Sequence, residues 1–85
     1  DADKDLANFE KHGIDFFTAA LAFRDPSRII AVDEGHSKSE PRYFCIGKVG
    51  REIVTVRFTN RGQKIRIIGA GFWRKGRKLY EEETK

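Results

Sequence analysis

The hydrophobic residues at the start of the chain recur at the spacing of an α-helix. Leu6 and Phe9 share one side of a helix over residues 3–12 with Ala2. Gly13, directly after this segment, can adopt the left-handed backbone that ends a helix. The polar residues of the opposite side form a stripe that consists of Asp1, Lys4, Asn8, Lys11 and His12. The pattern therefore predicts a two-faced helix whose polar stripe ends in a histidine.

A second helix is predicted over residues 15–24. Asp15 can cap its first turn, as Asp1 or Asp3 can for the first helix. Its apolar face consists of Phe16, Ala20 and Phe23. The helix ends at Asp25-Pro26, because proline cannot continue the hydrogen-bond pattern of a helix.

A polar connector and three strands follow. The connector, residues 25–41, is rich in Asp, Ser, Gly and Pro, and residues 28–32 within it can form a short strand. Connectors of this length are usually functional or mobile. The strands are predicted over residues 42–48, 51–59 and 63–70, with turns at Val49-Gly50 and Asn60-Arg61-Gly62. Because these turns are too short for a crossover connection, the strands are antiparallel neighbours.

Alternation along the last two strands separates two faces of the sheet. Val54, Val56 and Phe58 alternate with Ile53, Thr55, Arg57 and Thr59, and Ile65 and Ile67 alternate with Lys64 and Arg66. One face is therefore core, and the other carries Arg57 and Arg66. A basic helix is expected over residues 72–83, with Trp73, Leu79 and Tyr80 as its anchors. The pattern predicts a single α+β domain over residues 1–85, with two N-terminal helices, an antiparallel sheet of three or four strands and a C-terminal helix.

Charge is divided unevenly between the two halves of the chain. Residues 1–41 contain five Lys and Arg against nine Asp and Glu, whereas residues 42–85 contain twelve against four. The basic half favours a polyanionic partner. Cys45 is the only cysteine, which excludes an intrachain disulfide, and no segment approaches the apolar length of a signal or membrane span. The expected location is the reducing cytoplasm.

Several short motifs stand in order along the chain. They are Asp1-x-x-Lys4-x-x-x-Asn8-x-x-Lys11-His12-Gly13-x-x-Phe16, His36-Ser37-x-x-Glu40-x-Arg42, Ile46-Gly47, Phe58-Thr59-x-Arg61-Gly62 and Ile65-Arg66-Ile67-Ile68. In these motifs the chain resembles the BrnT-type toxins, also described as a domain of unknown function, which are ribonucleases of type II toxin–antitoxin pairs. The likeness covers nearly the whole chain with matching order and spacing, which makes it more specific than any single motif.

The resemblance implies a RelE-like fold, in which helices pack on one face of a small antiparallel sheet and the other face is open and basic. It also implies a ribbon-helix-helix antitoxin that binds operator DNA, in a complex of two toxins with two antitoxins. Many relatives carry a strand before the position of Asp1, so its absence here predicts an unpaired sheet edge. Where relatives end the last strand in Ser-Ala-Arg, this chain has Gly69-Ala70-Gly71, and Arg74 is the residue that can replace that arginine.

Cleavage of RNA requires little from a protein, because the 2′-hydroxyl of RNA is itself the nucleophile. A base, an acid and cations that stabilise the phosphorane are sufficient, and imidazole and guanidinium groups supply them near neutral pH. The candidate catalytic residues are Lys11, His12, His36, Glu40, Arg42 and Arg66. The candidate RNA-binding residues are Lys4, Arg57, Arg61, Arg74 and Lys75. No cofactor is expected.

Structural roles are open for several of these residues. His12 can satisfy helix-terminal carbonyls, His36 can be merely exposed, and Glu40 can pair with a cation, while Asn8 is expected to bond to backbone. A metal site is not expected, because one cysteine and two histidines lack a ligand spacing. Two functions fit: a metal-independent endoribonuclease toxin that inhibits translation, and a non-catalytic basic module that binds nucleic acid or a protein.

Overall fold

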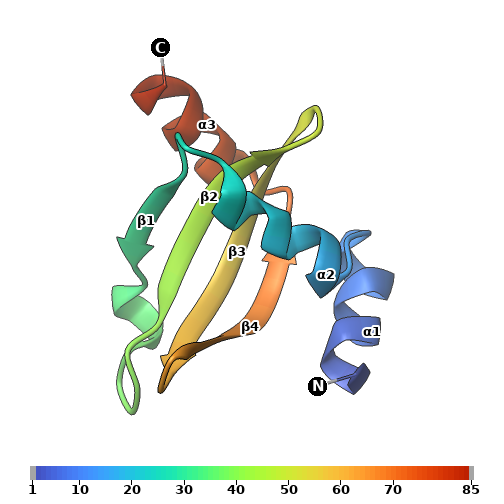
Figure 1. Ribbon diagram of the computed structural model, residues 1–85, viewed down its shortest axis with the longest axis vertical. Helices are drawn as coiled ribbons and strands as arrows, with labels where there is room; N and C mark the ends of the chain where they lie inside the picture. Colours follow the sequence, from blue (N-terminus) through green and yellow to red (C-terminus); the bar gives the residue numbers. More distant parts are fainter. Residues whose placement is uncertain (1, 85) are drawn as a thin grey trace.

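A four-stranded antiparallel sheet in the order β1-β2-β3-β4 organises the protein (Figure 1). The computed structural model describes residues 2–84, and Asp1 of the expected polar stripe lies outside them. The elements are α1 (Ala2–His12), α2 (Phe16–Ala19), the 3₁₀-helix η1 (Ala20–Arg24), β1 (Ile29–Val32), the 3₁₀-helix η2 (Glu34–His36), β2 (Tyr43–Val49), β3 (Glu52–Arg61), β4 (Lys64–Gly71) and α3 (Arg74–Glu83). The predicted α+β class is confirmed, with four strands.

The bounds of most elements lie one or two residues from those predicted, the turn predicted at Val49-Gly50 falls at Gly50-Arg51, and two further differences change the local structure. The helix expected over residues 15–24 is α-helical only to Ala19, and its second half tightens into η1, where Asp25 N–H donates to the Ala22 carbonyl. The turn predicted to begin at Asn60 is also wrong, because β3 continues to Arg61. The connection to β4 is thus a two-residue turn in which Gly62 adopts a positive φ of 63°.

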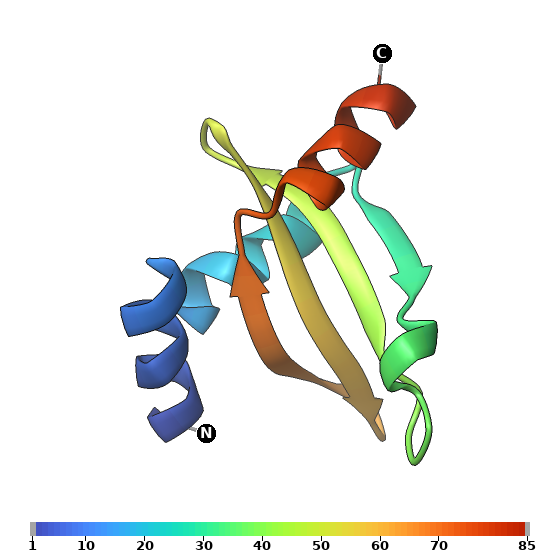
Figure 2. The same cartoon turned by 180° about the vertical axis from the view of Figure 1, so that it is seen from behind.

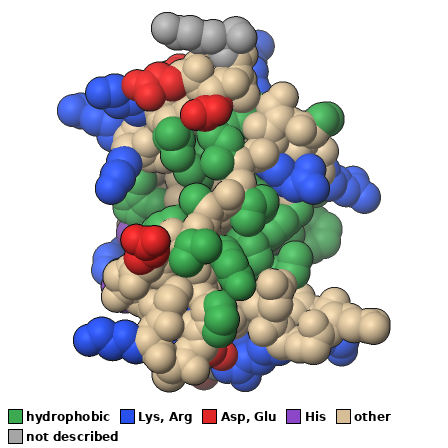
Figure 3. All heavy atoms as spheres, turned by 90° about the vertical axis from the view of Figure 1, so that its left-hand side faces the viewer, with side chains coloured by type: hydrophobic (Ala, Val, Ile, Leu, Met, Phe, Trp, Pro, Cys, Tyr) green, Lys and Arg blue, Asp and Glu red, His purple; other side chains and the backbone are tan. Residues whose placement is uncertain are grey.

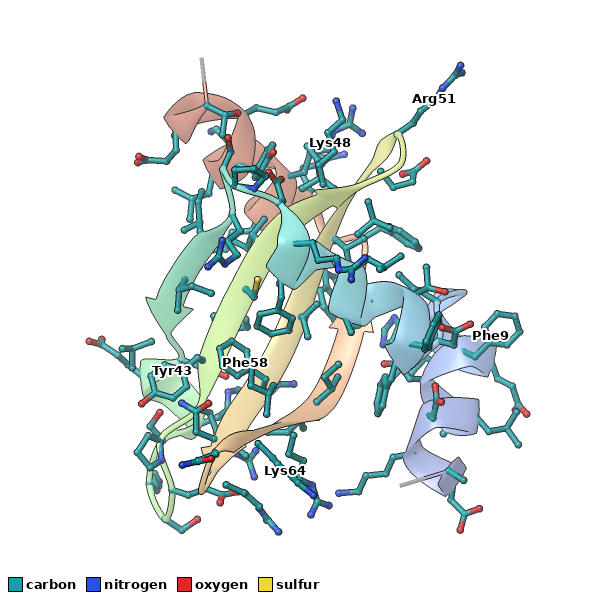
Figure 4. All side chains as sticks on the ribbon, in the orientation of Figure 1. Phe9, Tyr43, Lys48, Arg51, Phe58 and Lys64 are labelled. Carbon is teal, nitrogen blue, oxygen red and sulfur yellow. The ribbon has the colours of Figure 1, made fainter. Side chains whose placement is uncertain are left out.

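The α2–η1 segment covers one face of the sheet and builds the core. The ring of Phe23 packs edge-on against Phe58 with centroids 5.0 Å apart, and Tyr43 lies beside Phe58 on the same face (Figure 4). The backbone of η1 comes so close to β2 that a Cβ on Gly47 would overlap the carbonyl oxygen of Ala22. The buried core consists of Ile14, Ala19, Ala22, Cys45, Val54, Val56, Phe58 and Ala70.

Helix α3 packs on the opposite face, so the expectation that all helices share one face is wrong (Figure 2). Gly76 lies directly on Thr55 of β3, with no room between them for a Cβ. Tyr80 is 7% exposed, and its hydroxyl donates to the carboxylate of Asp25. This hydrogen bond raises the pKa of Tyr80 to about 12 and is the main cause that lowers the pKa of Asp25. Of the expected anchors, Tyr80 is buried, whereas Trp73 and Leu79 remain more than one-third exposed.

Helix α1 stands beside the β4 edge of the sheet (Figure 1). The Asn8 side chain joins three segments, because its Nδ2 donates to the Ile14 carbonyl at 2.8 Å and its Oδ1 accepts from Ala70 N–H at 3.0 Å. The expectation that Asn8 bonds to backbone is confirmed. Gly13 ends α1 with a φ of 77°, as predicted. No helix within residues 2–84 has the length and apolar character needed to cross a membrane.

Candidate nucleic-acid interface

The part of the α3-bearing sheet face that α3 leaves uncovered is basic. Thr55 lies under Gly76 of α3, and alternation along β3 puts Arg57 and Thr59 on the same side. Arg66 is the direct cross-strand partner of Thr59. Arg42 precedes β2 and, because Tyr43 packs on the core side, points to this side as well. We call this surface, which carries Arg42, Arg57 and Arg66, the basic face; the placement of Arg57 and Arg66 opposite the core follows the alternation of the sequence.

The connector between β1 and β2 places an acid and a histidine at the edge of the basic face. Asp33 follows β1 directly, and its side chain is 7% exposed. Both of its carboxylate oxygens lie 3.1 Å from Nδ1 of His36, and Oδ2 is 3.6 Å from a terminal guanidinium nitrogen of Arg57. A buried carboxylate therefore links a histidine of one segment with an arginine of another.

The geometry fixes which ring nitrogen of His36 is available to a ligand. An ionised carboxylate only accepts hydrogen bonds, so contact with an ionised Asp33 favours the tautomer of His36 that carries its proton on Nδ1. The side chain of His36 is 58% exposed. Its Nε2 is therefore the atom through which His36 can take or give a proton.

Hydrogen bonds of backbone groups and of the Ser37 and Thr59 hydroxyls hold the connector in place. The Ser37 hydroxyl donates to the Asp33 carbonyl at 2.7 Å, and Arg42 N–H donates to the same hydroxyl oxygen. Asp33 N–H donates to the Arg42 carbonyl at 2.8 Å, and the Thr59 hydroxyl donates to the Pro41 carbonyl at 2.6 Å. The segment that carries His36 is thus tied to β1, to the start of β2 and to β3, although the sequence suggests a loose loop.

The structure also shows the contacts of two other candidate residues of this region, Glu40 and Arg42. Glu40 forms an ion pair with Arg61, with 3.7 Å between the carboxylate and the guanidinium. The Nε atom of Arg42 is buried and has no hydrogen-bond partner within residues 2–84. Because this Nε atom is buried, it does not itself face a ligand on the basic face.

The candidates of α1 lie at the other edge of the sheet. An open groove of about 330 Å³ between α1 and β4 is lined by Lys4, Ala7, Asn8, Lys11, His12 and Ile68. The ring of His12 packs edge-on against Trp73, with centroids 5.0 Å apart. Because β1 and β4 are the two outer strands, the structure separates His12 from His36. The remaining candidates, Arg74 and Lys75, are exposed in the first turn of α3.

Sequence reasoning missed Asp33, the residue that connects His36 to the basic face. The available signal was an acid at the end of a short apolar strand, three residues before a histidine. Cys45 is a poor nucleophile, because burial raises the pKa of its thiol to about 11. Within the described residues no group of three or more His, Cys, Asp or Glu side chains has the proximity needed to hold a metal ion.

The side of the molecule at β1 differs in character from the basic face. Hydrophobic side chains gather in the middle of this side, with Lys and Arg toward its margins (Figure 3). Ile30 and Val32 of β1 are 51% and 55% exposed. An outer strand with exposed apolar side chains suits contact with another protein.

Comparison with known protein families gives a match over most of the chain. The family model described as a ribonuclease toxin, BrnT, of a type II toxin–antitoxin system matches residues 1–76. The matched part contains the basic face, the connector with Asp33 and His36, and the groove beside α1. No curated protein matches the chain.

Proposed function

The chain belongs to the BrnT family of ribonuclease toxins of type II toxin–antitoxin systems, and we propose that it cleaves RNA without a metal ion and thereby inhibits translation in the cytoplasm. One observation carries the proposal: an exposed histidine, in hydrogen-bond contact with a buried carboxylate, stands at the edge of an open face with three arginines. Arginine binds phosphate through two parallel N–H donors, and histidine transfers protons near neutral pH.

The chemistry needs one bond to form and one to break. The 2′-oxygen attacks the adjacent phosphorus, the bond from phosphorus to the 5′-oxygen breaks, and the products end in a 2′,3′-cyclic phosphate and a 5′-hydroxyl. His36, through Nε2, transfers one of the two protons that must move. The guanidinium groups of Arg57, Arg66 and Arg42 stabilise the negative charge that develops on the phosphorane.

The mechanism predicts RNA cleavage that persists in excess chelator, because the nucleophile and the charge-stabilising cations are supplied by RNA and by arginine. The purified protein should convert a labelled RNA to fragments with 2′,3′-cyclic phosphate ends, which mass spectrometry identifies. Activity that chelator abolishes and magnesium restores would reject this mechanism. Binding of RNA without any cleavage would instead support the non-catalytic basic module.

Arg66→Ala should weaken RNA binding and flatten its salt dependence, because Arg66 faces outward on the basic face beside Thr59. Each lost phosphate contact makes the slope of log K against log salt less negative by about 0.7 for single strands. The measurement uses an RNA with 2′-O-methyl groups, which cannot be cleaved, so that binding is separated from chemistry. Cleavage of ordinary RNA should fall together with the affinity.

Arg51→Ala is the matched control for this measurement. The Arg51→Ala substitution removes the same charge as Arg66→Ala. Arg51, however, lies at the tip of the β2–β3 hairpin, at the opposite end of the sheet from Lys64 (Figure 4). Its substitution should leave the salt slope unchanged. An Arg66→Ala protein with the parent affinity and slope would show that the basic face does not bind the phosphates.

Membership in a type II toxin–antitoxin family implies an antitoxin partner. We propose that this partner is a ribbon-helix-helix protein, that two copies of each protein form the complex, and that the outer strand β1 contributes to the contact. The exposed Ile30 and Val32 support a protein partner there.

A further inference from the structure

Asp33 is the most deeply buried of the described carboxylates, and it lies close to the basic face. A charged group is not expected to be buried, and Asp33 is not part of the sequence motifs. Asp33 is 5% exposed, while His36 beside it is mostly exposed. Burial of an ionised carboxylate costs free energy unless charged or hydrogen-bonding partners compensate it. Its described side-chain partners are the His36 imidazole and the Arg57 guanidinium.

We propose that Asp33 is a positioning residue, which sets the tautomer and orientation of His36 and at the same time holds the guanidinium of Arg57 beside it. The inference rests on the proposed function, since it assigns the two partners their tasks in proton transfer and phosphate binding. Both tasks demand a fixed relation between two side chains from distant segments. One carboxylate that contacts both of them supplies that relation.

Asp33 can perform this task because its own position is fixed by the backbone. Its N–H donates to the Arg42 carbonyl, and its carbonyl accepts from the Ser37 hydroxyl and from His36 N–H. The main chain is therefore bonded on both sides of the carboxylate. The side chain is only 7% exposed, so packing limits its direction, and His36 and Arg57 take their positions from it.

The effect on His36 is a matter of proton placement. The imidazole of free histidine prefers the proton on Nε2, which would leave Nδ1 as the acceptor. Hydrogen bonding to the Asp33 carboxylate reverses this preference, because Nδ1 must then be the donor. Nε2 is left unprotonated in the neutral ring and faces solvent, where it can accept the proton of a 2′-hydroxyl.

The direct test is the tautomer of His36, measured from ¹⁵N chemical shifts at a pH where both histidine rings are neutral. The intact protein should show the proton on Nδ1 of His36, and Asp33→Ala should shift it to Nε2. His12 serves as an internal control, because its ring packs on Trp73 at the other edge of the sheet and should not change. A His36→Gln variant assigns the two sets of signals. An intact protein with His36 protonated on Nε2 would overturn the proposal.

The catalytic readout follows both tasks of Asp33, because kcat reports proton transfer by His36 and KM reports phosphate binding by Arg57. Asp33→Ala, which removes the contacts to both His36 and Arg57, should lower kcat at least about tenfold and raise KM. Asp33→Asn also loses the charge that holds Arg57, and its amide N–H can donate to Nδ1, so the proton of His36 should shift to Nε2, kcat should fall and KM should rise. The matched control is Glu34→Gln, which removes an exposed carboxylate from the same segment and should change neither. Parent kinetics in both Asp33 variants would overturn the proposal.

The tautomer measurement and the cleavage assay test the positioning role and the proposed function separately. A protein that cleaves no RNA, but whose His36 tautomer depends on Asp33, would reject the proposed function and keep the positioning role. If the protein cleaves RNA, but substitution of Asp33 changes neither the His36 tautomer nor the kinetics, the proposed function stands and the positioning role is rejected. Circular dichroism of each variant shows whether it is folded, and if Asp33→Ala does not fold, Asp33→Asn and the intact protein decide the question.

Discussion

His36→Ala should lower the single-turnover rate of RNA cleavage by about 100-fold or more, because general acid–base catalysis contributes factors of that order. The affinity for an RNA with 2′-O-methyl groups should stay close to that of the parent, since the arginines of the basic face remain. The side chain is 58% exposed, so its removal leaves no cavity in the core. Loss of rate without loss of binding or of folded structure is thus the expected signature.

His12→Ala provides the matched comparison, because the two histidines lie at opposite edges of the sheet. Only the histidine that transfers a proton should show a large loss of rate at constant affinity. If His36→Ala cuts RNA as fast as the parent, His36 is neither the acid nor the base. If both variants do so, proton transfer passes to Lys4, Lys11 or Arg74.

The sheet was predictable from sequence because alternation and tight turns are local signals. The side chains of Val54, Val56 and Phe58 alternate with polar ones, and the structure places them in the core as expected. The position of α3 was not predictable in the same way. It depends on the contact of Gly76 with Thr55 and on the hydrogen bond of Tyr80 with Asp25, which join residues far apart in the chain.

The candidate site also has a part that was predictable from local sequence patterns and a part that was not. That Arg57 and Arg66 share a face follows from strand alternation, and the sequence predicted it. The link of Asp33 to Arg57 did not follow, because it requires β1 to pair with β2, and β2 with β3, in registers that no local pattern encodes. The separation of His12 from His36 likewise depends on the order of the strands, which puts their segments at opposite edges.

Gly47→Ala should cause the largest loss of stability among single-methyl additions to the core. A Cβ at this position would overlap the carbonyl oxygen of Ala22 and would also lie 3.1 Å from its Cα. Both obstructing groups are backbone, so no side-chain rotation can relieve the overlap, and η1 must move away from β2. Such a movement also loosens the packing of Phe23 on Phe58, which joins the α2–η1 layer to the sheet.

Overpacking of this kind costs about 3 kcal/mol, and each kcal/mol lowers the Tm of a domain of this size by about 4–8 °C. Gly47→Ala should therefore melt at least about 10 °C below the parent when unfolding is followed by circular dichroism. Gly35→Ala is the matched control, because the nearest atom to its Cβ would be Asp33 Oδ1 at 3.8 Å, an ordinary contact. Its Tm should stay within about 4 °C of the parent, given that surface substitutions change stability by about 0.5 kcal/mol at most. Equal melting of the two variants would mean that η1 does not press on β2 as described, and that the core tolerates a wider spacing of its layers.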